Sequence, residues 1–289
     1  MCHNQKGFIM RINTNVSSLT AQEAAVNTNK TLSSSLEKLS TGLKINKASD
    51  DASGLAIADK LRTQATSINQ GIANGNSAVA LLQIADKSMS EQSNILDTIK
   101  AKLIQANTDT TSTDGRASIA KDINKLLEQL NNIAEQTNYN GRQLISNATA
   151  AGASSKHVFQ VGEKNTDTIT LKSLNSNTVG LSLGALSAAA GGTLTKTIAA
   201  AQQTVINKAI TTLNAYRGDI GSTQNQVESA VRNLATQATN VKAAESIIRD
   251  VDYAQESANF NKQNIISQAG SYAISQANTV QQNVLKLLQ

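Results

Sequence analysis

Residues 35–62 read SLEKLSTGLKINKASDDASGLAIADKLR, a stretch in which one helical pattern stops and a second begins. Leucines three or four residues apart end near Gly42, and a polar run then reaches Ser49. Ser49 or Asp50 is expected to cap the second helix by accepting a hydrogen bond from a backbone N–H. The negative charge of Asp51, in the first turn, is expected to interact favourably with the helix dipole. Adjacent carboxylates without a histidine or metal ligand suit acid–base catalysis poorly, so we interpret the pair as a helix boundary.

The composition favours long helices throughout the chain. The 289 residues include no proline and no tryptophan, and aromatic residues make up 2%. Proline alone is about 5% of an average soluble protein, and it is the commonest helix breaker. The sequence therefore predicts a mainly α fold: a long coiled-coil helical bundle built from both chain termini, with a small β-hairpin and loop region in the middle.

Charge and reactive residues limit the possible function classes. The net charge of +5 comes from 26 basic and 21 acidic residues, with no basic run interleaved with aromatics, so no nucleic-acid partner is expected. Cys2 is the only cysteine, and the two histidines, His3 and His157, cannot form a HExxH zinc site. We expect both histidines at the surface, and no catalytic residue, metal or cofactor.

Neither end of the chain carries a membrane or secretion signal that composition can identify. No apolar run has signal-peptide length, and none reaches the roughly 18 residues of a membrane span, so no membrane insertion is expected. Met10 is a possible true start, which would make residues 1–9 a leader or a mis-called start.

The middle of the chain follows helical spacing except in one region. Apolar seams run through 51–106 and 117–136, and again from Thr197 to Ile248, with a possible break at Gly218 and Gly221. Residues 147–195 instead contain two short alternating segments, HVFQVG and DTITLK, and a glycine-rich tail, so a helix is not expected there. Two glycines inside the second helix, Gly71 and Gly75, indicate close packing by a neighbour.

Both chain ends carry the most regular apolar seams, although chain ends are usually frayed. A helix with one narrow seam needs partners, so the terminal helices are expected to pair with each other and with those of neighbouring subunits. The predicted polymer interface comprises Val16, Leu19, Leu36, Leu39, Leu43, Val251, Ala254, Ala258, Ile265, Val280, Val284 and Leu287.

Four ordered motifs resemble those of bacterial flagellins, and in particular flagellins of epsilon-group proteobacteria. They are MRINTNVSSL at 10–19, the opening stretch at 35–62, QTNYNGRQLI at 136–145, and RDVDYAQESANFNKQNIISQAGSYAISQANTVQQNVLKLL at 249–288. The resemblance implies a terminal inner-tube domain with a spoke, a surrounding helical-bundle domain and a short outer segment. The corresponding ranges are 10–49 with 248–289, 50–146 with 196–247, and 147–195.

The resemblance also implies a function: a structural subunit that polymerises into the extracellular flagellar filament used for swimming. Its implied partners are copies of itself, an export chaperone on the C-terminal helix, the filament cap and hook-associated proteins, with type III export in place of a signal peptide. The alternatives are a hook–filament junction adaptor, a metalloprotease-bearing flagellin, which would need a HExxH helix, and a generic coiled-coil scaffold. Serines and threonines in 147–195 are candidate sites for O-linked sugars.

One segment departs from the family pattern. Where flagellins detected by the vertebrate Toll-like receptor resemble LQRVRELAVQ, this chain has LDTIKAKLIQ at 96–105. Thr98 replaces an arginine and Lys102 an acidic residue, while Asp122 only partly keeps the acidic partner on the next helix. Loss of a bidentate arginine and reversal of a charge both weaken an interface, so weak stimulation of that receptor is expected.

Overall fold

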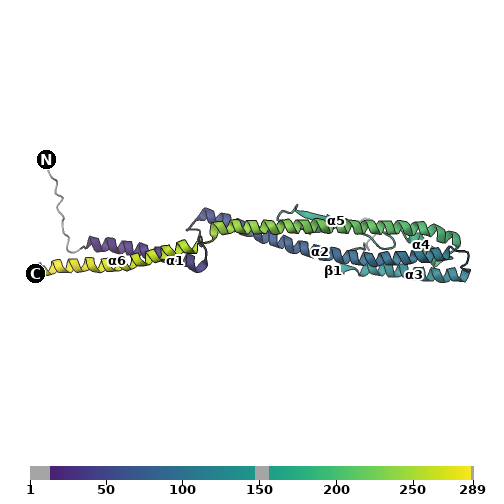
Figure 1. The fold of residues 1–289 in the computed structure, drawn as a ribbon, viewed down its shortest axis with the longest axis horizontal. Coiled ribbons are helices and arrows are strands. Elements are labelled where there is room, and N and C mark those ends of the chain that lie inside the picture. Colours follow the sequence, from purple (N-terminus) through teal and green to yellow (C-terminus); the bar gives the residue numbers. More distant parts are fainter. Residues whose placement is uncertain (1–13, 147–155, 288–289) are drawn as a thin grey trace, which may run out of the picture. The chain divides into compact units, whose positions relative to one another are not determined.

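The chain is mainly α-helical, as predicted (Figure 1). The computed structural model describes residues 14–146 and 156–287. Within these ranges the elements are α1 (Val16–Thr41), α2 (Ala52–Ala106), α3 (Thr113–Gln136), β1 (Asn138–Tyr139), β2 (Arg142–Gln143), β3 (His157–Gln160), β4 (Thr168–Leu171), α4 (Gly184–Gly191), α5 (Lys196–Arg249) and α6 (Tyr253–Leu287).

The helices form two compact units. The terminal unit contains α1, α6, the first residues of α2 up to Arg62 and the last of α5 from Val241. The central unit, from Thr63 to Asn240, contains the rest of α2 and α5 together with α3, α4 and all four strands. The strands form two separate antiparallel hairpins, β1–β2 and β3–β4.

The paired aspartates mark a helix boundary, but each does so differently from the prediction. The side chain of Asp51 caps α2, because its Oδ1 accepts from the Gly54 N–H at 2.9 Å. Asp50 instead accepts from the N–H groups of Asn46 and Lys47, at 3.1 and 3.0 Å, and so closes the connecting loop. The prediction that Ser49 or Asp50 would cap α2 was therefore wrong by one or two residues, since α2 begins only at Ala52.

The core of the central unit is a continuous aliphatic stripe. The helices α2, α3 and α5 bury their periodic apolar side chains against one another. Leucines of α4 and of the loop before it pack against the same core. The largest of these fully buried residues are Leu82, Met89, Leu96, Ile99, Leu103, Ile123, Leu130, Leu183, Leu186 and Ile206.

The helix α4 corrects the expectation that residues 147–195 contain no helix. It spans Gly184–Gly191 and buries Leu186 and Ala190 against the core. The glycines at either end obscured a short run rich in alanine, the strongest helix former, and tertiary packing decided its conformation.

Two glycines in α2 are required by close packing, as predicted. A Cβ added at Gly71 would lie 2.3 Å from the Val161 carbonyl oxygen, and one at Gly75 would lie 2.4 Å from Val231 Cγ2. By contrast, α5 runs without interruption through Gly218, where a Cβ would meet no neighbour within 4 Å. The possible break at that position is therefore absent.

Replacing Gly71 with alanine is expected to lower the free energy of unfolding by ~1–3 kcal/mol, because the Val161 backbone must move. The matched change Gly218→Ala should raise it by ~0.5–1 kcal/mol, since alanine restricts the unfolded chain and clashes with nothing. Chemical denaturation of the two variants measures both effects. Equal stabilisation by both changes would contradict the close packing at Gly71.

His157 is buried, not exposed as predicted. It starts β3, where it pairs with Leu171, and its exposed fraction is 3%. Burial lowers the pKa of His157, and the nearby positive charge of Arg142 lowers this pKa further, against a smaller opposing effect of a hydrogen bond with the Leu144 backbone. The apolar alternation of β3 carries the ring inward because position 157 shares the inward face with Phe159 and Val161.

The stability of the central unit should consequently fall as the pH drops below about 6.5, the ordinary histidine pKa. In that window the unfolded chain binds a proton that the folded chain does not, so acid favours unfolding. Replacing His157 with glutamine should flatten the slope of melting temperature against pH between about 5.5 and 7. An unchanged slope would show that His157 does not cause it.

Candidate polymerisation interface

The two terminal helices pack side by side as an antiparallel pair (Figure 1). Near the start of α1, Asn15 Nδ2 donates to the carbonyl oxygen of Ala277, 3.1 Å away on the later part of α6. Near the end of α1, the Ser35 hydroxyl bonds the carboxylate of Glu256 in the first turn of α6. These contacts join residues more than 200 positions apart, so the ends of the chain together form one structural element.

The seam between α1 and α6 repeats in steps of three and four, the spacing of a coiled coil. Its less exposed residues on α1 are Ser18, Ala21, Ala25, Thr28, Leu32, Ser35 and Leu39. Those on α6 are Glu256, Phe260, Gln263, Ser267, Gly270, Ile274, Ala277 and Gln281. Most of them are small or polar, so this contact brings the backbones close and buries little apolar surface.

Many of the larger apolar residues of both helices lie on the outside of the pair. Val16, Leu19 and Leu36 on α1, and Ile265 and Val280 on α6, are each more than half exposed. Burying one such side chain contributes roughly 1.5–3 kcal/mol, so leaving this many in solvent forgoes a large stabilisation. An exposed apolar surface of this kind is typical of a face that another protein covers.

The other predicted interface residues fall into four groups. Ala254 and Ala258 are exposed on α6 beside the large residues, whereas Leu39 is half-buried in the α1–α6 seam. Leu43 follows the end of α1 and Val251 precedes the start of α6, and the backbones of these two connections are hydrogen-bonded to each other. The side chains of Val284 and Leu287 lie outside the described residues.

A backbone clamp fixes the end of the helix pair. Gly42 ends α1 in the left-handed conformation (φ 74°), which glycine adopts without strain, and its carbonyl accepts from the Val251 N–H at 3.0 Å. The Lys44 N–H donates to the Arg249 carbonyl at 2.6 Å, and Leu43 and Asp250 form an antiparallel bridge between them. The connection between α1 and α2 is therefore tied to the connection between α5 and α6.

Electrostatic contacts reinforce this connection. The backbone N–H groups of Lys47 and then Asn46 hold the pKa of Asp50 below its ordinary value. Lys47 Nζ lies 2.7 Å from Glu37 Oε2 on α1, which raises the pKa of Lys47. Because these groups are exposed, they contribute only modestly to the free energy of unfolding. Their main effect is to set the geometry of the loop.

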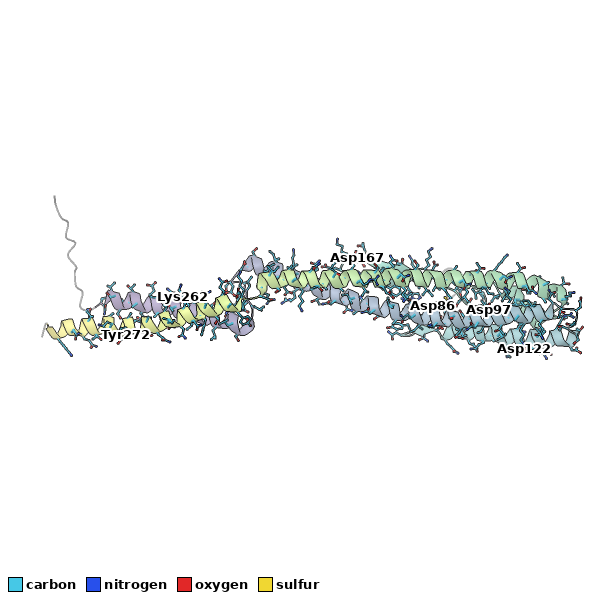
Figure 2. All side chains as sticks on the ribbon, in the orientation of Figure 1. Asp86, Asp97, Asp122, Asp167, Lys262 and Tyr272 are labelled. Atoms are coloured by element: carbon cyan, nitrogen blue, oxygen red, sulfur yellow. The ribbon has the colours of Figure 1, made fainter. Side chains whose placement is uncertain are left out.

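The structure adds outward apolar residues that the sequence argument did not select. Ile266 and Tyr272 of α6 and Ile247 near the end of α5 are exposed, and Tyr272, seen in Figure 2, has an exposed fraction of 74%. These residues fall between the positions of the predicted apolar seam, so the helical spacing of that seam did not include them. The available signal was that Tyr272 is one of only seven aromatic residues in the chain.

The departures from the receptor-binding pattern lie on the outer side of α2 and α3. Thr98 is exposed and its hydroxyl donates to the Asn94 carbonyl of the preceding turn at 2.9 Å. Lys102 Nζ lies 2.7 Å from Asp122 Oδ2, so the two predicted residues form an ion pair between α2 and α3. This pairing occupies the one carboxylate that otherwise resembles the expected acidic partner.

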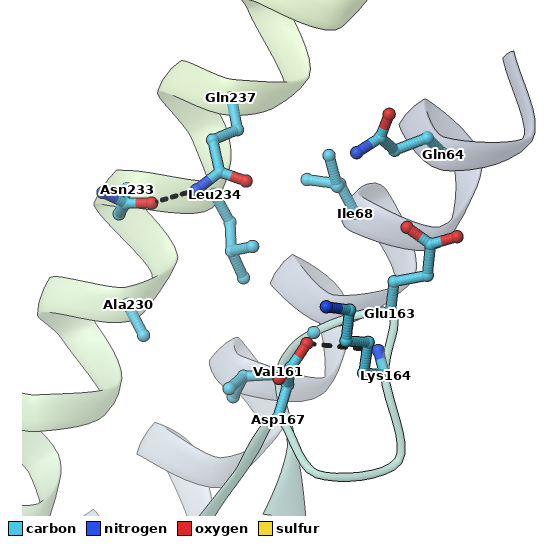
Figure 3. Close-up of a pocket in the computed structure, with 11 residues that line it drawn as sticks. Gln64, Ile68, Val161, Glu163, Lys164, Asp167, Ala230, Asn233, Leu234 and Gln237 are labelled. Atoms are coloured by element: carbon cyan, nitrogen blue, oxygen red, sulfur yellow. Dashed lines mark hydrogen bonds between the residues drawn. The ribbon is translucent and has the colours of Figure 1, made fainter. Parts of the chain in front are cut away.

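A cavity of about 350 Å³ lies beside the β3–β4 turn, between α2 and α5 (Figure 3). Three of its polar side chains, those of Asp167, Asn233 and Gln237, have partners within the chain. Asp167 Oδ2 accepts from the Lys164 N–H at 3.1 Å, and the amides of Asn233 and Gln237 bond each other. Ile68, Val161 and Leu234 supply an apolar lining. The arrangement serves the hairpin turn, since the Asp167 carboxylate is used by the loop itself.

The described residues offer neither a metal-binding cluster nor a membrane-spanning helix. Over residues 14–146 and 156–287, no three histidine, cysteine or acidic side chains gather closely enough to hold a metal ion. Among the helices so described, none combines the length and apolarity needed to cross a membrane. Cys2, His3 and Met10, singled out above, lie outside the described residues.

Comparison with known proteins identifies relatives along most of the chain. The chain is 34% identical to the flagellin of Bacillus subtilis (strain 168) over 305 aligned positions, covering 96% of this chain and all of the relative. It is 47% identical to flagellin B of Helicobacter pylori (strain J99 / ATCC 700824) over 172 positions, covering 59% of this chain. That alignment spans 32% of the Helicobacter protein, so the chain matches about a third of its length.

A solved structure assigned to a flagellar hook-associated protein from Vibrio parahaemolyticus shares the fold, with a TM-score of 0.58 and 14% identity over 69% of this chain and 99% of that one. The family model described as the bacterial flagellin N-terminal helical region matches residues 12–150. The model described as the bacterial flagellin C-terminal helical region matches residues 203–288. These two matches cover most of the chain, and the Helicobacter relative confirms the predicted resemblance to epsilon-group proteins. The chain belongs to the bacterial flagellin family.

Proposed function

We propose that this chain is the structural subunit of a bacterial flagellar filament, assembled through the outward face of its terminal helices. The observation that carries the proposal is the pattern of α1 and α6: mostly small or polar residues lie between them, and many of their large apolar residues lie outside. A monomer gains nothing from that arrangement, whereas a polymer buries the outward residues at every subunit contact.

The composition of α6 supports the same conclusion. Between Lys262 and Lys286 the helix carries no charged residue, so its outward face can be covered on several sides without desolvating a charge. Contacts between different faces of identical subunits do not close on themselves and generate helical filaments. The flagellin family is a structural protein family, and we propose no catalytic activity for this member.

A hook–filament junction adaptor is the second candidate, since the hook-associated neighbour from Vibrio shares the fold. At 14% identity that likeness concerns the fold alone. The flagellin relatives are more similar in sequence and cover up to 96% of the chain, which favours the filament subunit. Growth distinguishes the candidates, because a filament subunit elongates from seeds without limit and an adaptor does not.

Replacing Ile265 with serine should raise the critical concentration for seeded polymerisation more than about tenfold, since one large side chain is lost from each contact. The matched control is Val179→Ser in the central unit, which removes a comparably exposed valine (79%) and should change polymerisation little. Electron microscopy and sedimentation of seeded mixtures measure the polymer. Unaltered growth of the Ile265 variant, or equal effects of both changes, would contradict this interface.

The remaining partners follow from the same surface. A soluble subunit that exposes the outward face of α6 needs protection before export, and we propose an export chaperone that covers this helix. Filament cap and hook-associated proteins are proposed to meet the same terminal unit at the two ends of the polymer. The site of action is then extracellular, on the flagellum.

We further propose weak stimulation of the vertebrate flagellin receptor. The double change Thr98→Arg and Lys102→Glu should raise potency in a receptor reporter assay by about tenfold, because it restores a guanidinium and an acidic group. Lys172→Glu, a charge reversal at an exposed position in the central unit, is the control and should leave potency unchanged. High potency of the unmodified chain would contradict the proposal directly.

A further inference from the structure

The turn between β1 and β2 presents an Asn–Gly pair to solvent. Asn140 and Gly141 are the two central residues of this hairpin, and both are exposed. Both have positive φ, 52° and 77°, as a type I′ turn requires. The flanking strands contribute only the pairs Asn138–Gln143 and Tyr139–Arg142, so the hairpin can open locally at small cost.

The two reacting groups of this pair are free among the described residues. Neither the side-chain amide of Asn140 nor the backbone N–H of Gly141 has a hydrogen-bond partner there. Gly141 is exposed, and a Cβ added there would meet nothing within 4 Å, so the space beside its Cα is open. We propose that Asn140 is a site of spontaneous deamidation, in which the Gly141 nitrogen displaces the side-chain amide.

The chemistry needs only solvent water. The lone pair of the Gly141 nitrogen forms a bond to Asn140 Cγ, and the Cγ–Nδ2 bond breaks, with its electron pair leaving as ammonia. The ammonia carries the proton that the Gly141 nitrogen loses, so a cyclic imide remains. Water then opens the imide at either carbonyl and yields aspartate or isoaspartate, with no oxidation or reduction.

The chain contains a second Asn–Gly pair, Asn74–Gly75, whose environment is the opposite. It lies inside α2, where the Gly75 N–H belongs to the helical ladder. Asn74 Nδ2 donates to the Gln160 carbonyl at 3.1 Å, and Asn74 Oδ1 accepts from Gln70 Nε2 at 2.9 Å. Attack at Asn74 requires both hydrogen bonds and a turn of α2 to open, so this pair is the matched internal control.

Conversion would alter the hairpin in two ways. Either product adds a negative charge two residues from Arg142, whose guanidinium donates to the Lys156 carbonyl at 2.9 Å. Isoaspartate also lengthens the main chain by one carbon, which is incompatible with the Tyr139–Arg142 pairing across a two-residue turn. The inference does not depend on the proposed assembly function.

The test follows both pairs in the full-length folded chain, incubated in mildly alkaline buffer and sampled over time. Trypsin releases peptides 126–142 and 63–87, which contain Asn140 and Asn74 respectively. Fragmentation mass spectrometry locates each converted residue, and isoaspartyl methyltransferase labels the isoaspartate product. A parallel sample in guanidinium gives the rates without the fold, and Asn140→Gln confirms the assignment by abolishing conversion at that position.

In the folded chain, Asn140 should convert at least about tenfold faster than Asn74, and the two rates should converge in guanidinium. Equal rates in the folded chain, or no conversion of Asn140, would overturn the proposal. A difference between the two conversion rates that persists in guanidinium would also overturn the proposal. The neighbouring sequence, and not the folded turn, would then be the cause of the faster conversion at Asn140. Conversion of Asn138 in the same peptide should stay slow, since a bulky tyrosine follows it.

Discussion

The antiparallel contact between α1 and α6 is the interaction on which the rest of the terminal unit depends. Because most seam residues, such as Ala25 and Gly270, are small or polar, the seam holds few large apolar side chains, and residues such as Leu19 and Ile265 face outward. Serine, threonine and glutamine along the seam add hydrogen-bonding groups in place of apolar contact. Helix pairing and the proposed polymer contact thereby use different faces of the same helices.

The central unit follows the opposite design. Its large aliphatic residues point inward along α2, α3 and α5, where they form a core of its own. Gly71 lets the β3–β4 hairpin lie directly on α2, because Val161 occupies the space of a Cβ. The two units therefore differ in where their large apolar side chains lie: inward in the central unit and, for many of them, outward in the terminal unit.

Most of the fold could be predicted from sequence because long helices leave a strong periodic signal. The seams of α2 and α3, the close packing at Gly71 and the boundary near Asp50 all follow from local rules. Local rules failed at α4, where an alanine-rich run is stabilised by burying Leu186, and at His157, whose burial depends on the partner strand. The candidate interface was predicted as a set of positions, without the direction that each side chain faces.

The sequence by itself determined the helical class, the family and the assignment of both chain ends to one element, since periodicity and ordered motifs require no knowledge of contacts. Only the tertiary structure decided which face of α1 meets α6. Both the small residues and the large apolar ones recur at helical spacing, so periodicity cannot rank them, and the distance between the backbones makes the choice. Small residues such as Ser267, Gly270 and Ala277 permit that close approach, and many of the larger side chains remain on the outside.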